Sequence, residues 1–291
     1  MIKNVVVVDP QWNHETLRAT CVMNDQSGLR ADTVIIDTHG QVFLEINEWG
    51  FGGPAIDPAR RKAVVWGDSV VFGYGQGWVS LMDRGDRDGA WQFLNGGLPG
   101  DATAGIVDRA ARDNGRFDIA ANIFFPGWHP SSSEGPTNTD LERQLERLAK
   151  AVPNVVLCTM PTPLDEHVVG RDISGCIGNM TSEAIPPVPF LDFVRRYREN
   201  VFFFWGSFDY SRERCANIYR NLLERNELIR RFAGKSGMPL VDMFAAMRTT
   251  SDQDFRTYFY DVCHPRPSSY EKLAGVLYAE VNTFLGQLPC R

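Results

Sequence analysis

The side chain best placed for chemistry is the hydroxyl of Ser69, which ends the tripeptide Gly67-Asp68-Ser69. The apolar run at residues 63–66 just before it is long enough for a buried strand. Ligands of open α/β sheets bind beyond the carboxyl ends of the strands, so a serine in a tight turn there could act as a nucleophile. Glycine, aspartate and serine are also common turn formers, and an ordinary turn at the end of a strand is the alternative interpretation.

A second reactive group is the segment Tyr260-Asp-Val-Cys-His-Pro265, just before the last predicted helix. A serine attacks well only when a base takes its proton, and that base is usually a histidine oriented by a carboxylate. In a tight loop, Asp261 could reach one ring nitrogen of His264 and leave the other free. A histidine before a helix is also often a structural hydrogen-bonding residue, and the Asp-x-x-His spacing alone does not separate the two interpretations.

The third stretch, Asn95-Gly-Gly-Leu-Pro-Gly-Asp-Ala-Thr103, joins a predicted strand to a predicted helix. Glycine lets the backbone approach a ligand closely, and N–H groups near a helix start can stabilise an anion. A plain strand-to-helix turn is the alternative. The stretch contains neither Gly-x-Gly-x-x-Gly nor Gly-Lys-Ser/Thr, which argues against a phosphate-binding loop.

Alternating strand and helix patterns predict the framework that would position these residues. Such alternation is typical of a mainly parallel sheet in a three-layer α/β/α sandwich. Asp101 is a candidate cap for the first long helix, and residues 138–140 for the second. The predicted strands are 63–66, 91–95, 118–125, 154–160 and 238–243, and the predicted helices are 103–112, 141–152, 215–233 and 270–285.

The N-terminal part differs from the rest, because it has strand-like runs and no helical period. We predict a β-rich N-terminal extension or small module at residues 1–60, with a hairpin turn at 37–40. The α/β domain then covers residues 61–291. An insertion at about 161–210 interrupts its alternation; its aromatic content argues against disorder. This insertion either shapes a pocket near the strand ends or forms a surface appendage remote from any site.

Composition excludes several classes of function. The 291 residues are 43% hydrophobic and 23% charged, with a net charge of −6, so the chain can bury a full core and has no basic excess for nucleic acid. No apolar run is long enough to span a membrane and the N-terminus does not resemble a signal peptide, so we expect a cytoplasmic protein without a membrane partner. The sequence is compatible with a homo-oligomer and does not specify one.

The six cysteines are scattered and form no Cys-x-x-Cys pair, so in such a protein we expect them to be reduced. A zinc site using Cys263 and His264 would need a distant third ligand, and the spacing gives it no support. We therefore predict neither a metal nor another cofactor.

Together, the three stretches resemble the SGNH hydrolases, also called GDSL esterases and lipases, over roughly residues 62–285. The resemblance implies that Ser69 is the nucleophile and that Asp261 and His264 complete a catalytic triad. It also implies that Gly100 and the Ser69 N–H form an oxyanion hole. The implied fold is a flavodoxin-like sandwich, and the implied reaction is ester hydrolysis without a metal.

One block departs from the family pattern. Where these enzymes have Gly-x-Asn, with the Asn donating to the oxyanion, this chain has Phe125-Pro-Gly-Trp-His129. A neutral imidazole can donate one hydrogen bond, so His129 could replace the Asn. His129 could instead face an acidic group of the substrate, or be structural in a chain that has lost part of the oxyanion hole. We expect Asp68 to brace the nucleophile turn and not to act as a base.

The leading hypothesis is a serine esterase that forms an acyl-enzyme and removes an acyl group, such as acetate, from a polar metabolite or saccharide. Two alternatives remain. One is an acyltransferase that uses the same triad, and the other is a weakly active or inactive binding protein on the hydrolase fold.

Overall fold

The computed structural model describes residues 4–7, 28–36, 42–73, 77–86, 88–128, 138–164, 212–249, 258–259, 263–265 and 269–289. The predicted hairpin turn at 37–40, His129, Asp261 and most of the predicted insertion at 161–210 lie outside these ranges.

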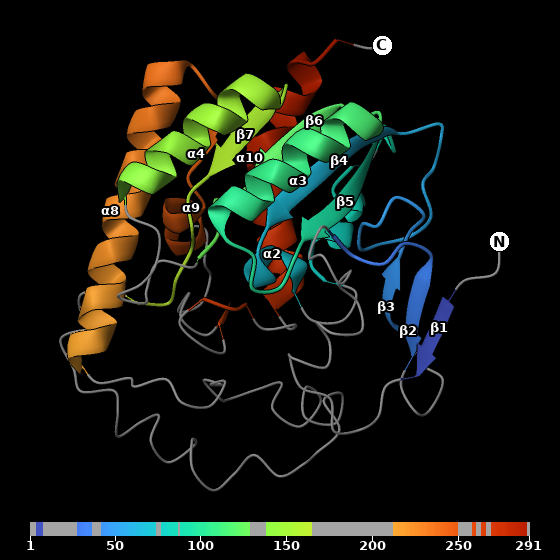
Figure 1. The fold of residues 1–291 in the computed structure, drawn as a ribbon, viewed down its shortest axis with the longest axis horizontal. Helices are drawn as coiled ribbons and strands as arrows, with labels where there is room; N and C mark the ends of the chain where they lie inside the picture. Colours follow the sequence, from blue (N-terminus) through green and yellow to red (C-terminus); the bar gives the residue numbers. More distant parts are fainter. Residues whose placement is uncertain are drawn as a thin grey trace, which may run out of the picture.

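The N-terminal strands form a three-stranded sheet of their own, beside the main domain (Figure 1). β1 (Asn4–Val7) pairs in parallel with β2 (Thr33–Ile36), and β2 pairs antiparallel with β3 (Val42–Ile46). The β-rich N-terminal extension of the predicted fold is therefore present.

The main sheet has five strands, all parallel, in the order β5-β4-β6-β7-β8. Numbered along the chain from β4, this order is 2-1-3-4-5, the flavodoxin-like arrangement. β4 therefore lies inside the sheet, with β5 on one side and β6 on the other. The strands are β4 (Arg61–Gly67), β5 (Trp91–Gly97), β6 (Ala121–Phe124), β7 (Val155–Cys158) and β8 (Leu240–Val241).

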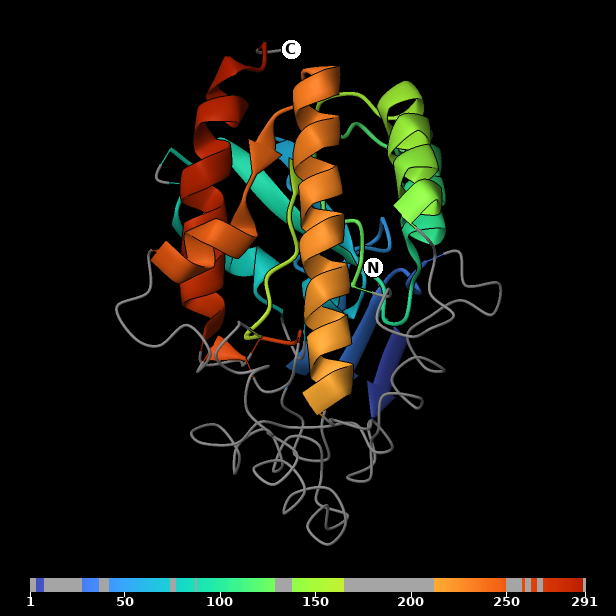
Figure 2. The ribbon, with the colours of Figure 1, turned by 90° about the vertical axis from the view of Figure 1, so that its left-hand side faces the viewer.

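Helices cover both faces of this sheet, which confirms the predicted three-layer sandwich. α3 (Thr103–Arg116) and α4 (Asn138–Ala151) pack on one face. On the other lie α2 (Ser69–Phe72), the 3-10 helix η1 (Val79–Arg84), α9 (Met243–Thr249) and α10 (Tyr270–Gln287). The long helix α8 (Arg212–Ser236) contributes to both cores and runs between α4 and α10 (Figure 2).

The alternation of side chains in β4 explains why two separate cores form. Ala63 and Val65 point into the core under α10, whereas Val64 and Trp66 point into the core under α3. All four are fully buried, as expected for a central strand covered on both faces. This burial holds the carboxyl end of β4, and thus Ser69, in a fixed position.

Several element boundaries differ from the predicted ones. The capping role of Asp101 is wrong: Ala102 is the N-cap of α3, and the Asp101 carboxylate pairs with Arg109 at 2.9 Å. The predicted strand 238–243 is also too long, because Asp242 accepts a hydrogen bond from the Ala245 backbone N–H and starts α9 instead. The short helices α2, η1 and α9 were not predicted, since they are too short to show helical periodicity.

The segment after β3 ties the N-terminal strands to the main domain. Gly52 forms an antiparallel bridge with Asn95 on the outer edge of β5, through N–H···O distances of 2.9 and 3.1 Å. Trp49 stacks on Phe117, just past α3, with ring centroids 4.6 Å apart. These contacts cover part of a sheet edge that would otherwise be open to pairing with another chain.

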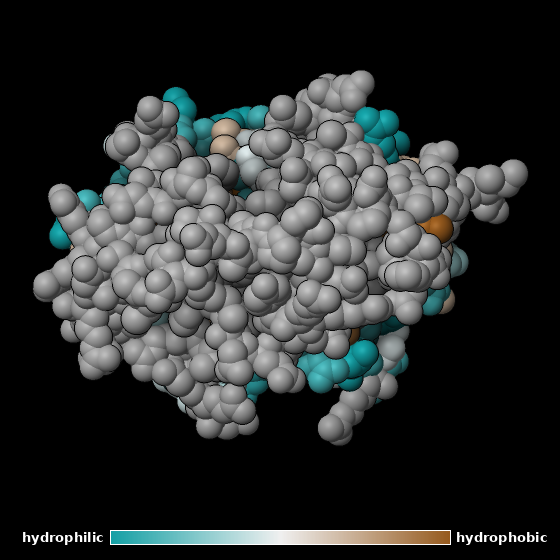
Figure 3. All heavy atoms as spheres, turned by 90° about the horizontal axis from the view of Figure 1, so that it is seen from below, coloured by the Kyte–Doolittle hydropathy of each residue, from teal (hydrophilic) through white to brown (hydrophobic). Residues whose placement is uncertain are grey.

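Within the described ranges, no helix has the length and apolar character needed to cross a bilayer. On the face seen in Figure 3, the described residues that reach the surface are mostly hydrophilic, and the few apolar ones are set apart from one another.

Candidate active site

Ser69 stands just beyond the carboxyl end of β4 as the first residue of α2, and its side chain is half-buried. Two glycines at the strand ends allow α2 to fold back this closely. A Cβ at Gly67 would lie 2.3 Å from a methyl carbon of Val71, and a Cβ at Gly97 would lie 2.2 Å from the Phe72 nitrogen. Any side chain at either position would therefore displace the turn that carries Ser69.

Asp68 holds the turn with both oxygens of its buried carboxylate. Oδ1 accepts a hydrogen bond from the Val70 N–H at 3.0 Å, which caps α2, and Oδ2 accepts one from the Trp128 N–H. The second contact ties the nucleophile turn to the segment that follows β6. Both oxygens of the Asp68 carboxylate thus accept hydrogen bonds from backbone N–H groups, and through them Asp68 braces the nucleophile turn.

His264 meets Ser69 from the other end of the sequence. The Ser69 Oγ and the His264 Nε2 are 2.8 Å apart, although 195 residues separate them. This distance is within hydrogen-bond reach, as transfer of the serine proton to the imidazole requires. The other ring nitrogen, Nδ1, lies 3.4 Å from the Cys263 sulfur. Asp261 is outside the described residues, so its predicted role stays a prediction.

Among the described residues, two neutral contacts help to hold the loop that carries His264. Phe259 and Pro265 form an antiparallel bridge, and the Ser269 hydroxyl donates to the Tyr258 carbonyl at 2.8 Å. Helix α10 begins directly afterwards at Tyr270. A Cβ at Gly73, which ends α2, would lie 3.2 Å from the Tyr270 hydroxyl, so only glycine lets α10 approach α2 this closely.

Gly100 lies in the turn that leads from β5 into α3. Its φ of +72° is in the left-handed region that favours glycine. The turn is anchored beside the nucleophile, because the Leu98 N–H donates to the Gly67 carbonyl at 3.0 Å. The predicted oxyanion-hole role of Gly100 stays a prediction, as does that of His129, which lies outside the described residues.

Arg109 is a buried residue that the sequence analysis missed. Its guanidinium donates to Asp101 Oδ2 at 2.9 Å, to the Gly96 carbonyl at 2.7 Å and to the Gly67 carbonyl at 3.1 Å. One side chain thus joins the ends of β4 and β5 to the turn that contains Gly100. Nothing in the sequence distinguishes it from the other α3 arginines except its position on the apolar face of the helix.

Burial is the largest influence on the pKa values of Asp101 and Arg109. It raises the pKa of Asp101 above its ordinary 3.8, and the attraction and hydrogen bond of Arg109 only partly oppose the shift. Burial also lowers the pKa of Arg109, with Asp101 opposing the change. Both charges are therefore costly to bury, and each depends on the other.

The segment after β6 also lies beside the nucleophile turn, through the hydrogen bond from the Trp128 N–H to Asp68. Gly127, with a φ of +88°, leads to Trp128, whose buried indole Nε1–H has no hydrogen-bond partner within the described structure. Arg225 of α8 is also buried, and the Asp68 carboxylate attracts its guanidinium. Burial lowers the pKa of Arg225 to about 10, and attraction to the Asp68 and Asp140 carboxylates opposes that shift.

Metal-ligating side chains do not gather in the part of the chain that the structure describes: no group of three or more His, Cys, Asp or Glu there could hold an ion. Cys158 and Cys263 are buried and carry reduced thiols, and burial raises the pKa of the Cys158 thiol well above its ordinary value.

Comparison with solved structures identifies the fold, although no family model and no curated protein matches the chain. A putative GDSL-like lipase from Parabacteroides merdae superposes with a TM-score of 0.51 at 15% identity, covering 79% of this chain and 99% of its own. A lipase/acylhydrolase from Enterococcus faecalis gives 0.50 at 18% identity, covering 79% and 98%. The chain has the fold of these GDSL-like lipases.

A carbohydrate acetylesterase family member from Sinorhizobium meliloti also has a TM-score of 0.50, at 14% identity, covering 78% of this chain and 99% of its own. The fold that the sequence resemblance implied is therefore confirmed. Sequence identities this low support a conclusion about the fold alone.

Proposed function

We propose that this protein is a serine hydrolase that cleaves carboxylic esters through an acyl-enzyme. The observation that carries the proposal is the 2.8 Å contact between the Ser69 hydroxyl and His264 Nε2 at the carboxyl edge of a parallel sheet. Two half-buried reactive groups from opposite ends of the chain meet where ligands of such sheets bind. The shared fold with GDSL-like lipases supports the same reaction class.

In this mechanism the Ser69 Oγ attacks the ester carbonyl carbon while its proton passes to His264 Nε2. The N–H groups of Ser69 and Gly100, with His129, stabilise the negative charge that develops on the carbonyl oxygen. His264 then gives its proton to the departing alcohol, and the acyl group remains on Ser69. Water deprotonated by His264 attacks the acyl-enzyme and releases the carboxylic acid, which restores Ser69. Asp261 orients His264 through Nδ1.

We propose a short acyl group, such as acetate, on a polar metabolite or saccharide as the substrate. The Sinorhizobium meliloti structure with this fold is described as a carbohydrate acetylesterase family member, so acetylated saccharides are the first substrates to test.

Fluorophosphonate labelling followed by intact-mass measurement tests the nucleophile. We expect one label on Ser69, and loss of labelling together with a fall of at least about 10³-fold in p-nitrophenyl acetate hydrolysis in Ser69→Ala and in His264→Ala. Ser236→Ala is the matched control, because the Ser236 hydroxyl is exposed at the end of α8 and donates only to backbone carbonyls.

Folded wild-type protein that takes no label and hydrolyses no activated ester would refute the proposal. Labelling that survives in Ser69→Ala would show that another residue is the nucleophile.

A further inference from the structure

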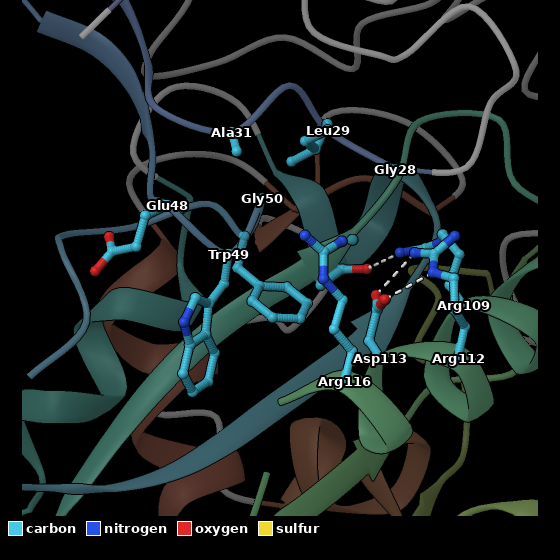
Figure 4. Close-up of a pocket in the computed structure, with 13 residues that line it drawn as sticks. Gly28, Leu29, Ala31, Glu48, Trp49, Gly50, Arg109, Arg112, Asp113 and Arg116 are labelled. Carbon is cyan, nitrogen blue, oxygen red and sulfur yellow. Dashed lines mark hydrogen bonds and ion pairs between the residues drawn. The ribbon is translucent and has the colours of Figure 1, made fainter. Parts of the chain in front are cut away.

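A cavity lies between the N-terminal strands and α3, and we call it the seam pocket (Figure 4). Trp49 and Gly50 line it from the segment after β3, and Arg109, Arg112 and Arg116 line it from α3. Its volume is about 360 Å³, within the usual range for small-molecule sites. Neither Ser69, Gly100 nor His264 lines it, although Arg109, which also holds the strand ends beside Ser69, does.

One end of the seam pocket is positively charged. The three arginines are spaced i, i+3 and i+7, so they share one face of α3. Arg109 is committed to Asp101 and two carbonyls, and Arg112 pairs with Asp113 at 2.7 and 2.9 Å. The Arg116 guanidinium lies 4.8 Å from the ring centroid of its neighbour Phe117, and no carboxylate of the described residues pairs with it.

Two carboxylates line the seam pocket, and neither pairs with Arg116. That of Asp113 pairs with Arg112. Glu48 also lines the seam pocket, but its carboxylate lies beyond Trp49, at the opposite end from the arginines (Figure 4). There it accepts a hydrogen bond from the Ile56 N–H at 3.2 Å. A cationic end is notable in a chain whose net charge is −6.

Aromatic rings form an apolar wall beside this charge. The Trp49 indole is held by its stack on Phe117, and Phe51 packs edge-on against the same ring with centroids 6.0 Å apart. Because Phe51 is buried and Trp49 is stacked, the wall is already in place before any ligand arrives. The seam pocket therefore offers one cation next to a preformed apolar surface.

We propose that the seam pocket binds a small organic carboxylate, with the carboxylate paired to Arg116 and the apolar body against Trp49 and Phe51. A planar guanidinium matches a carboxylate through two parallel hydrogen bonds. Of the three pocket arginines, Arg116 alone has no carboxylate partner among the described residues, so a monoanion matches its charge, whereas a dianionic phosphate would leave a negative charge uncompensated. The binding does not depend on the proposed esterase reaction.

Isothermal titration calorimetry of the full chain with benzoate tests this site, with benzamide as the neutral ligand of the same shape. We expect saturable binding of one benzoate, and binding of benzamide weaker by roughly two- to fivefold, as for loss of an ion pair to the exposed Arg116. Arg116→Gln should weaken benzoate binding by a similar factor. Arg143→Gln is the matched control, because Arg143 is an exposed helical arginine on α4 outside the seam pocket.

His264→Ala separates the seam pocket from the proposed reaction centre, where a carboxylate product could also bind. Benzoate affinity unchanged in His264→Ala and reduced in Arg116→Gln supports the proposal. Affinity lost in His264→Ala but kept in Arg116→Gln overturns it, as does the absence of saturable binding. Inorganic phosphate that binds more tightly than benzoate would also overturn it, since the ligand class would then be a phosphoryl group.

Discussion

Ser69 and His264 meet at 2.8 Å, yet the chain holds these two residues by different means. Buried charged groups fix the Ser69 side: the Asp68 carboxylate accepts two backbone N–H groups, and Arg109 donates to three oxygens. On the His264 side, the contacts seen between described residues are neutral and include the Phe259–Pro265 bridge and the Ser269 hydrogen bond.

This difference predicts on which side a substitution destabilises the protein most. Removing a buried charged group leaves its former partners buried without hydrogen bonds, which costs far more than the net contribution of an ordinary hydrogen bond. We therefore expect substitutions on the Ser69 side to lower the free energy of unfolding strongly, and those on the His264 side to change the reaction rate more than stability.

The largest effect is expected from Arg109→Met. This change leaves the Asp101 carboxylate, whose side chain is only 13% exposed, without a cation and removes the donors to the Gly96 and Gly67 carbonyls. The free energy of unfolding, measured with urea, should fall by about 3–5 kcal/mol. Arg147→Met, at a half-exposed arginine on α4, should change it by less than about 0.5 kcal/mol. A loss below about 1 kcal/mol in Arg109→Met would show that the Ser69 side is not held by its buried charges.

Asp68→Ala should come next. The backbone N–H groups of Val70 and Trp128 would lose their acceptor in a buried region, which predicts a loss of about 2–4 kcal/mol by urea denaturation. Asp68→Asn keeps one acceptor oxygen, so its loss should fall between wild type and Asp68→Ala. Equal stability of all three proteins would contradict the bracing role.

Ser269→Ala tests the His264 side. Loss of one neutral hydrogen bond to the Tyr258 carbonyl should lower the free energy of unfolding by about 1 kcal/mol. We expect kcat for p-nitrophenyl acetate to fall with little change in KM, because the loop that positions His264 loosens while the Ser69 turn stays intact. If Ser269→Ala destabilises the protein as much as Asp68→Ala does, the proposed contrast between the two sides disappears.

The smallest effect concerns pH. Burial raises the folded-state pKa of Asp101 above 3.8, so the folded protein keeps this proton longer than the unfolded chain does. The stability contribution of Asp101 is therefore full below pH 3.8 and is lost as pH rises through the raised pKa. The free energy of unfolding of wild type minus that of Asp101→Asn should decrease as pH rises from 3.5 toward neutrality. An increase over this range would contradict a raised pKa of Asp101 in the folded protein.

Much of the framework follows from local sequence. The β4 run and the periodic apolar positions of α4, α8 and α10 predicted the alternation of strands and helices, because burial on one or two faces leaves a repeating pattern. The ends of elements were less predictable. Asp101 has the residue type of a cap but pairs with Arg109 eight positions later, a choice set by packing and not by local preference.

The sequence by itself determined which residues were candidates for chemistry: a serine after a buried strand, a histidine before the last helix and a glycine-rich turn between them. Only the tertiary structure decided that Ser69 and His264 touch, and that Arg109 joins the ends of two strands. Contacts across 195 residues depend on the order of strands in the sheet and on how closely α2 and α10 pack. Local periodicity does not encode either property, because a strand has the same pattern of buried side chains whichever strands lie beside it.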